Sequence, residues 1–444
     1  MDTGSARFVP KAESQVTFIE AAFDGRVVTK DDPADKGIDF MYEKGVLLVL
    51  DEYLDRVIEI VTRPEETAPR EEGEGGPRVE RVVRGVSLLS LRGSRFTGGE
   101  GEGVIEALEV IDAELGEGAA TPNHVLTVSP VIPCPANEPG TVTDEVEPEP
   151  GPCSREWGEG VRVYVADTGL AAGSVQAHSW LAGVHGEVDP IPIPPHIPPY
   201  VGHGTFVAGV LKCMAPSAEV FVANVFDTAG SALESDAVPK LEAALGQGYD
   251  LINLTASTKT RKDLPLLTFD VWRKHLRQRG KGIACVVAAG NNDSHKPFWP
   301  AAFPGMVAVG ALAADGRHRA AFSNHGGWVD VYAPGRDLVN AYASGTYTCI
   351  DPPFTGQVRY FHGMCRWSGT SFSTPIVTGL IAARMSRTGE NGREAAAAML
   401  AFARSQAIPG VGAVLLPCQA GCDTISHKCG CSACGACRPT PGCH

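Results

Sequence analysis

The segment around Ser371 places a hydroxyl group at the expected start of a helix. Ser371 follows a turn of small residues and precedes an apolar run at helical spacing, so a helix is predicted to Arg384, with Gly389 as its stop. Pro375 falls within about the first turn, where a missing N–H costs least. Such a turn often serves only as a cap. A serine there also feels the positive end of the helix dipole, which favours negative charge beside it, so Ser371 is a candidate nucleophile.

Two upstream segments offer an acid and a base. An apolar run that begins at Val161 ends in Asp167, which predicts a buried parallel strand with a carboxylate at its carboxyl end, where open α/β sheets place their sites. His203 opens an apolar segment, 204–210, that is predicted to be a helix with small residues for close packing. An acid, a base and a nucleophile are the three groups that nucleophilic catalysis by a serine requires.

The order Asp167, His203, Ser371 and the residues around each of them resemble the subtilisin-like serine proteases. The matching motifs are Asp-Thr-Gly, His-Gly-Thr-x-x-Ala-Gly and Gly-Thr-Ser-x-x-x-Pro. A fourth match, Ala288-Ala289-Gly290-Asn291, corresponds to the oxyanion segment of that family. The resemblance covers roughly residues 156 to 405 and implies an α/β, subtilisin-like three-layer fold with a mostly parallel sheet.

The resemblance implies a serine endopeptidase that hydrolyses peptide bonds through an acyl-enzyme. His203 would take the proton of Ser371, Asp167 would orient the imidazole, and the Asn291 amide would receive the oxyanion together with the Ser371 N–H. This chemistry requires no cofactor, and the implied partner is a protein or peptide substrate. The alternative is a catalytically silent fold of the same family that acts as a binding module through its cysteine-rich tail.

The expected substrate groove departs from the family pattern. After the strand-like run 251–254, the segment Thr255-Ala256-Ser257 stands where the family has a Ser-Leu/Phe-Gly edge that pairs with extended substrate. Ser257 in place of glycine is expected to crowd the pocket for the residue before the scissile bond, or to lend it a hydroxyl group. The other residues that the resemblance assigns to substrate binding are Ala288, Ala289 and Gly290.

The chain divides into four parts by composition. Residues 1–130 are predicted to form a small α+β domain, either a propeptide-like domain or an unrelated regulatory one, and 131–155 a linker rich in Pro, Glu and Gly. If the first part is a propeptide, cleavage is expected between about Pro133 and Trp157. The peptidase domain is predicted at 156–405, with a surface loop at 347–366 in which Cys349 and Cys365 are candidates for a disulfide.

The fourth part, 406–444, is a tail with seven of the chain's 13 cysteines. Four of them lie within nine residues, which permits a structural zinc site, a disulfide cluster or a reduced tail. Calcium binding is left open by the sequence. The residues of the candidate zinc site are Cys429, Cys431, Cys434 and Cys437.

Composition narrows the class of protein. The 444 residues are 43% apolar and carry a net charge of −14, which argues against nucleic acid as a partner because phosphate binding needs clustered Lys and Arg. No run approaches the roughly 20 apolar residues that a membrane span requires, and no secretory signal is visible. The sequence therefore favours a cytoplasmic location without excluding an extracellular one, and it leaves the oligomeric state open.

Overall fold

The structure is a computed structural model of the chain. It describes residues 11–32, 37–63, 76–96, 102–128, 138–143, 146–151, 153–191, 193–280 and 282–417. In this part of the chain, no helix combines the length and the apolar character needed to cross a membrane. The four candidate zinc ligands of the tail, together with the rest of 418–444, lie outside the described residues.

A seven-stranded sheet forms the centre of the C-terminal part, and all of its neighbouring strands run parallel. The chain adds strands first on one side of the central strand β6 and then on the other, so the sheet has a switch point beside β6, where α/β sheets place their sites. In spatial order, the strands are β15 (Val331–Pro334), β14 (Val307–Leu312), β13 (Ala284–Ala288), β12 (Leu251–Leu254), β6 (Arg162–Asp167), β10 (Glu219–Asn224) and β8 (Val184–Gly186).

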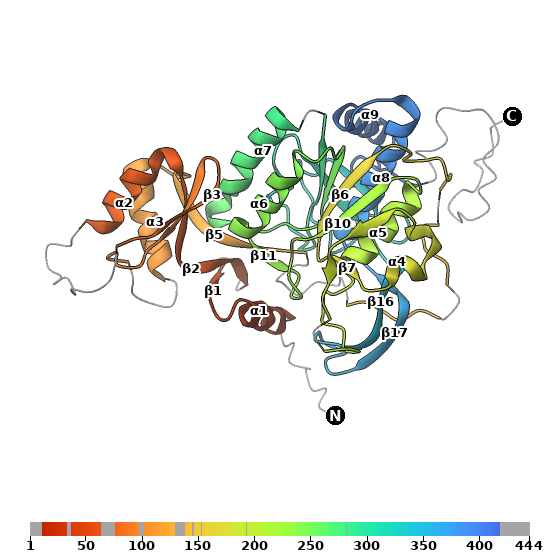
Figure 1. Cartoon of the computed structure of the whole chain (residues 1–444), viewed down its shortest axis with the longest axis horizontal. Coiled ribbons are helices and arrows are strands. Elements are labelled where there is room, and N and C mark those ends of the chain that lie inside the picture. Colours follow the sequence, from red (N-terminus) through yellow and green to blue (C-terminus); the bar gives the residue numbers. More distant parts are fainter. Residues whose placement is uncertain are drawn as a thin grey trace.

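Helices cover both faces of this sheet, which gives the three-layer α/β fold (Figure 1). One face carries α5 (His203–Met214), α8 (Thr370–Thr388) and α9 (Gly392–Ser405), and the other carries α6 (Glu234–Ala244) and α7 (Leu267–Arg279). The shorter elements are β7 (Leu170–Ala171), α4 (Ser174–Ala177), β9 (Val188–Asp189) and 3₁₀ turns at Asp51–Tyr53, Ser179–Leu181 and Arg261–Asp263.

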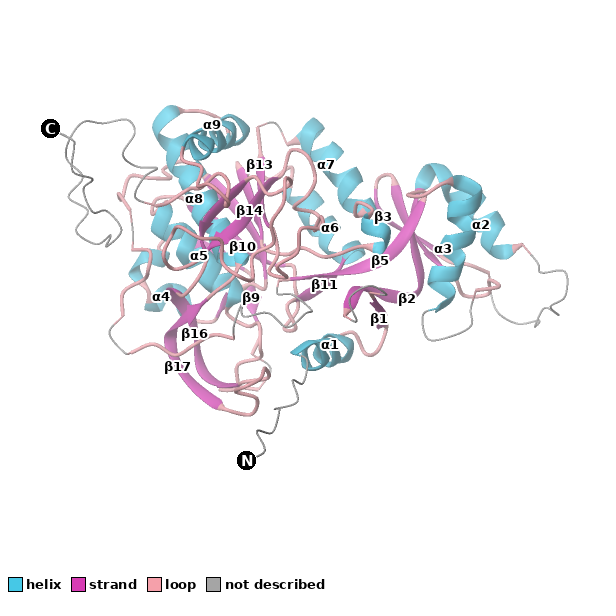
Figure 2. Cartoon of the chain, turned by 180° about the vertical axis from the view of Figure 1, so that it is seen from behind, coloured by secondary structure: helices cyan, strands magenta, loops and turns pink. Residues whose placement is uncertain are grey.

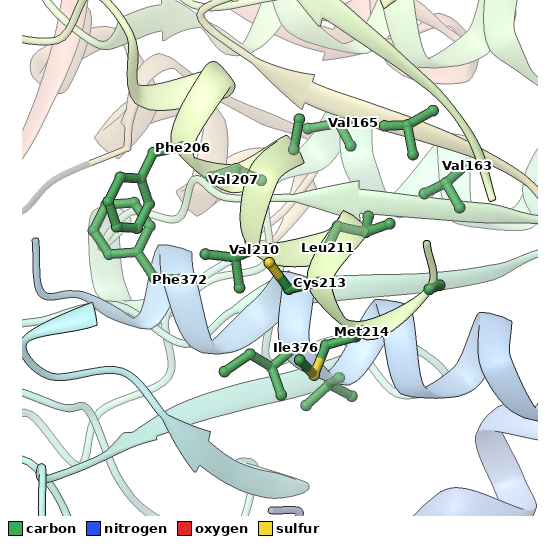
Figure 3. Close-up of a cluster of buried hydrophobic side chains, with 14 of the residues drawn as sticks. Val163, Val165, Phe206, Val207, Val210, Leu211, Cys213, Met214, Phe372 and Ile376 are labelled. Carbon is green, nitrogen blue, oxygen red and sulfur yellow. The ribbon is translucent and has the colours of Figure 1, made fainter. Parts of the chain in front are cut away.

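Close packing of α5 against α8 fixes the two helices that begin at His203 and just before Ser371. The rings of Phe206 and Phe372 lie 4.5 Å apart between their centroids, and these side chains face each other in Figure 3. A Cβ added to Gly379 would lie 2.5 Å from the Cβ of Met214, so only glycine permits this helix crossing. The core therefore sets the distance between the two helix starts.

An antiparallel sheet with two helices forms the N-terminal domain. Its strands lie in the order β5-β2-β4-β3, with α2 and α3 packed on one face around an apolar core of their own. An additional helix and strand, α1 and β1, precede β2 and were not predicted from the sequence. The elements are α1 (Lys11–Ala22), β1 (Val27–Asp31), β2 (Ile38–Leu50), α2 (Leu54–Thr62), β3 (Val79–Val83), β4 (Val86–Ser90), α3 (Glu102–Leu115) and β5 (Ala120–Thr127).

The second face of the N-terminal sheet packs against α6 and α7, opposite α2 and α3 (Figure 2). Its strand β5 also pairs antiparallel with β11 (Ser231–Leu233) of the C-terminal part. A backbone bridge on the other edge of β5 joins Thr127 to Ser257. The N-terminal domain thus inserts one strand between two segments of the C-terminal part.

Two sequence expectations for connecting segments need correction. The described residues of 138–155 contain no strand, as expected, but they are anchored to the C-terminal part by backbone bridges from Gly140 to Arg366 and from Glu149 to Val339. The predicted surface loop at 347–366 is wrong, because this region belongs to a long antiparallel hairpin of β16 (Leu338–Thr348) and β17 (Val358–Trp367).

The candidate disulfide between Cys349 and Cys365 is not formed, for a related reason. Cys365 lies opposite Asn340 in the hairpin, whereas Cys349 directly follows Thr348, which lies opposite Val358. The two thiols are therefore near opposite ends of the hairpin, and both are free and buried. A disulfide would require a different strand register.

Candidate active site

The sheet brings the predicted acid and base together. Asp167 is the last residue of β6 and His203 is the first of α5, and Asp167 Oδ1 lies 2.7 Å from His203 Nδ1. Both side chains are buried, and the rings of Trp367 and Phe372 lie 5.3 and 5.1 Å from the imidazole centroid. A buried carboxylate at Nδ1 holds the imidazole ring in place and leaves Nε2 as the nitrogen free for proton transfer.

Thr255 and Thr168 hold the Asp167 carboxylate. The Thr255 hydroxyl donates a short hydrogen bond to Asp167 Oδ2, and the Thr168 N–H donates to Oδ1 over 2.8 Å. Thr255 was predicted from the sequence to contact substrate, and the structure also gives it contact with the acid. Nothing in the local sequence signals this contact, because it joins the carboxyl ends of two strands far apart in the chain.

The Ser371 hydroxyl contacts the N-terminal domain. Its Oγ lies 3.1 Å from the carbonyl oxygen of Val128, the residue after β5, and 3.3 Å from the carbonyl oxygen of Thr255. Among the described residues, Ser371 has no hydrogen bond to His203. The inserted strand therefore reaches the candidate nucleophile, and the Ser371 hydroxyl contacts backbone carbonyl oxygens rather than His203.

The Asn291 side chain is oriented by the residue before Ser371. Asn291 Oδ1 accepts hydrogen bonds from the backbone N–H and the hydroxyl of Thr370, each over 2.8 Å. Because these donors identify the oxygen, the amide nitrogen is the end directed elsewhere. The Thr370 hydroxyl also accepts the N–H of Gly290 over 3.1 Å. Thr370 thus ties the candidate oxyanion donor to the start of α8.

Asp189 is a buried carboxyl group that sequence reasoning missed. Its Oδ2 accepts the Thr168 hydroxyl over 2.7 Å and the Gly202 N–H over 2.8 Å, while Oδ1 has no partner among the described residues. Burial raises the pKa of Asp189 to about 7, and the charge of Asp167 adds to that rise. This group connects the turn after Asp167 to the residue before His203, so it braces the acid–base pair.

A cavity lies beside Asn291, between the segments after β12 and β13. Of the predicted substrate-binding residues, Thr255, Ser257 and Gly290 line it together with Ala288. Ala256 and Ala289 are fully buried and do not line it. The Ser257 Oγ lies 3.1 Å from the position that a Cβ on Gly290 would take, so this side chain reaches across the cavity.

No group of three or more His, Cys, Asp or Glu side chains that could hold a metal ion occurs among the described residues.

Comparison with known proteins assigns the chain to a family. A model of the subtilase family, Peptidase S8, matches residues 158–408. The chain is 29% identical over 240 residues to a thermostable alkaline protease of Halalkalibacterium halodurans, covering 52% of this chain and 58% of that protein. It is 30% identical over 234 residues to Subtilisin Savinase of Lederbergia lenta, and the match covers 51% of this chain and 76% of that protein.

Solved structures similar to this chain include two that are named as proteases. A crystal structure of a cold adapted subtilisin-like serine proteinase aligns with a TM-score of 0.46 and 20% identity, over 64% of this chain and 96% of that one. The patellamide maturation protease PatA aligns with a TM-score of 0.44 and 26% identity, over 60% and 94%. The family assignment rests on the model match, which covers more than half of the chain. The chain belongs to the subtilase family.

Proposed function

We propose that this chain is a serine endopeptidase with Asp167, His203 and Ser371 as its catalytic triad. The observation that carries the proposal is the buried 2.7 Å contact of Asp167 with His203, at the same edge of the sheet as the start of α8. His203 Nε2 takes the Ser371 proton as Oγ attacks the substrate carbonyl carbon, and the imidazolium then returns that proton to the leaving amine. Water hydrolyses the resulting acyl-enzyme in a second step.

Asn291 and the N–H of Ser371 stabilise the oxyanion in this proposal. The Asn291 amide nitrogen is directed away from Thr370, whose two donors occupy the amide oxygen. A donor that is fixed before the reaction loses little free energy in reorganising as the negative charge develops. The substrate is a protein or peptide bound as an extended strand, because β5 already occupies the groove in that form.

The test compares Ser371→Ala with the unchanged chain. Hydrolysis of peptide substrates should fall by several orders of magnitude, since the nucleophile and its base act as one unit, while the variant keeps the wild-type circular dichroism spectrum. A fluorophosphonate probe should label the unchanged chain and not the variant. Equal hydrolysis or equal labelling would exclude Ser371 as the nucleophile and would favour a binding module in place of an enzyme.

We further propose that the N-terminal domain inhibits the site in cis and is released by cleavage. Support comes from β5, which is paired on both edges and ends with Val128 against Ser371. The sequence placed the cleavage between about Pro133 and Trp157, but the chain reaches the nucleophile earlier, and the described part of that window is anchored elsewhere through Gly140 and Glu149. The junction therefore lies within about two residues of Val128.

Intact-mass measurement distinguishes a cleavage junction near Val128 from one between Pro133 and Trp157. The unchanged chain should convert to two fragments, the first ending close to Val128, and Ser371→Ala should stay at full length. A full-length chain that is already active would exclude release by cleavage. A first fragment that ends beyond Pro133 would restore the junction expected from the sequence.

A further inference from the structure

A buried lysine lines the cavity beside Asn291. Lys259 is only 9% exposed, and its side-chain ammonium forms no hydrogen bond or ion pair with another residue of the described chain. Lysine side chains are rarely buried to this degree unless an anion pairs with them. A cavity that holds such a cation is therefore suited to a negatively charged occupant.

The N-terminal domain places an acid in this cavity. Asp39 of β2 lines the same space, and burial raises the pKa of its carboxyl group while the charge of Lys259 acts in the opposite direction. Asp32 lies 3.7 Å from Lys296, the second lysine that acts on Asp39. Asp263 of the C-terminal part also acts on Asp39, more weakly than either lysine. In the closed chain, two acids of the N-terminal domain thus face two lysines of the C-terminal part, Asp39 with Lys259 and Asp32 with Lys296.

The same pattern continues along the loop that carries Lys259. Arg261 lies 2.8 Å from Asp112 of α3, and Lys262 lies 3.0 Å from Asp112 and 2.7 Å from Glu117. Three cations within four residues are unusual in a chain with a net charge of −14. Once the N-terminal domain leaves, Arg261 and Lys262 lose Asp112 and Glu117, and Lys259, which lines the cavity, loses the nearby charge of Asp39.

The position of Val128 identifies which substrate residue meets Lys259. Its N–H donates to the Gly230 carbonyl over 2.9 Å, and its carbonyl oxygen faces the Ser371 hydroxyl rather than the Asn291 amide. An attacked carbonyl directs its oxygen to the oxyanion donors, so the scissile carbonyl of a substrate bound in this way belongs to the next residue. Val125 and Thr127 line the cavity, and Val128 lines its end. Every second side chain of a strand lies on the same side, so the residue after Val128 follows Val125 and Thr127 on the cavity side.

We propose that this cavity selects glutamate or aspartate immediately before the scissile bond, with the Lys259 ammonium as the recognition group. The inference rests on the proposed endopeptidase function and specifies its substrate class. A carboxylate in the cavity forms a charge-assisted hydrogen bond with Lys259 and takes the role that Asp39 plays in the closed chain. A neutral side chain leaves the buried ammonium unpaired.

The test uses peptides that copy β5, acetyl-Val-Leu-Thr-Val-X-aminomethylcoumarin, with X as Glu, Gln, Leu or Lys. At neutral pH, kcat/KM for the full chain should be about tenfold or more higher for Glu than for its neutral isostere Gln. Lys259→Met should bring this ratio close to one, and Lys259→Glu should favour the Lys peptide. The matched control is Lys274→Met, an exposed lysine on α7 that does not line the cavity, and it should keep the wild-type ratio.

A second variant is needed in case the N-terminal domain keeps the groove of the unchanged chain closed. Asp112→Lys with Glu117→Lys places like charges against Arg261 and Lys262 without changing the cavity, and the same four peptides are measured in it. Hydrolysis that depends on Ser371 but favours Gln or Leu, or a Glu preference that survives Lys259→Met, would overturn the acidic specificity alone. If neither the unchanged chain nor this double variant hydrolyses any peptide, the proposed endopeptidase function fails, and the proposed specificity fails with it.

Discussion

Asn291 and Thr370 form a two-point contact that fixes the orientation of the Asn291 amide at the start of α8. Both the N–H and the hydroxyl of Thr370 donate to Asn291 Oδ1 over 2.8 Å. Thr370 also accepts from the Gly290 N–H, so one hydroxyl group joins the two segments that flank the nucleophile. In the proposed mechanism, Thr370 is a positioning residue that acts on the substrate through Asn291.

Replacement of Thr370 with valine should lower kcat while KM changes little, because the amide loses a donor that orients it for the transition state. The expected fall is about tenfold to a hundredfold, less than the roughly 10²–10³-fold measured for loss of the oxyanion amide itself in subtilisin. Thr370→Ser keeps the hydroxyl group and should restore kcat. Steady-state kinetics of the two variants on one peptide test this prediction. Equal kcat values for the valine and serine variants would show that the Thr370 hydroxyl group does not orient the amide for catalysis.

The Asp189 carboxyl should make stability depend on pH. Its pKa is raised from 3.8 to about 7 by burial, so the native chain binds this proton more tightly than the unfolded chain does. The free energy of unfolding should therefore fall as pH rises from about 4 to about 7 and level off above that. Asp189→Asn should flatten the curve in this window.

Urea unfolding at several pH values measures this effect. Asp315→Asn is the control, because the pKa of exposed Asp315 is lowered to about 2 by its hydrogen bonds with His318, and its influence lies below the window. The Asp315 variant should keep the wild-type slope between pH 4 and 7. Identical slopes for the unchanged chain and the Asp189 variant would mean that this carboxyl is not the source.

The sequence predicted the parts of the site that depend on local pattern. An apolar run that ends in Asp167 and small-residue turns before the helices of His203 and Ser371 are features of short segments, and the structure places all three at one end of the sheet. The strand that begins near Val161 and the helix after His203 followed from the same kind of pattern.

Contacts between distant segments could not be predicted in this way. The hydrogen bond of Thr255 to Asp167 and that of Thr370 to Asn291 depend on strand order and helix placement, which no single segment encodes. The sequence predicts a surface loop at 347–366, but Pro352 and Pro353 lie between β16 and β17 and leave the strand pairing intact. The contact of Val128, at the end of β5, with Ser371 likewise depends on how the N-terminal sheet packs against the C-terminal part.

Leu126 should control how firmly the N-terminal domain closes the groove. It is fully buried among side chains of the C-terminal part, next to the pairing of β5 with β11. Leu126→Asp buries a charge there, so β5 should leave the groove and freshly purified chain should hydrolyse a small peptide several-fold faster at first contact. Val79→Asp changes a side chain of β3 that is 45% exposed and should leave the initial rate unchanged. Equal initial rates for all three proteins would contradict closure by β5.

Truncation after Pro417 tests whether the cysteine-rich tail takes part in catalysis. All residues proposed to act on substrate lie upstream, and the last described segment stays intact because the Leu415 N–H donates to the Tyr332 carbonyl over 2.9 Å. The truncated chain should therefore keep kcat/KM within about twofold on a small peptide. Metal analysis of both proteins tests the zinc hypothesis, which requires zinc in the full chain and none after truncation. A folded truncated chain without turnover would show that the tail is needed for hydrolysis.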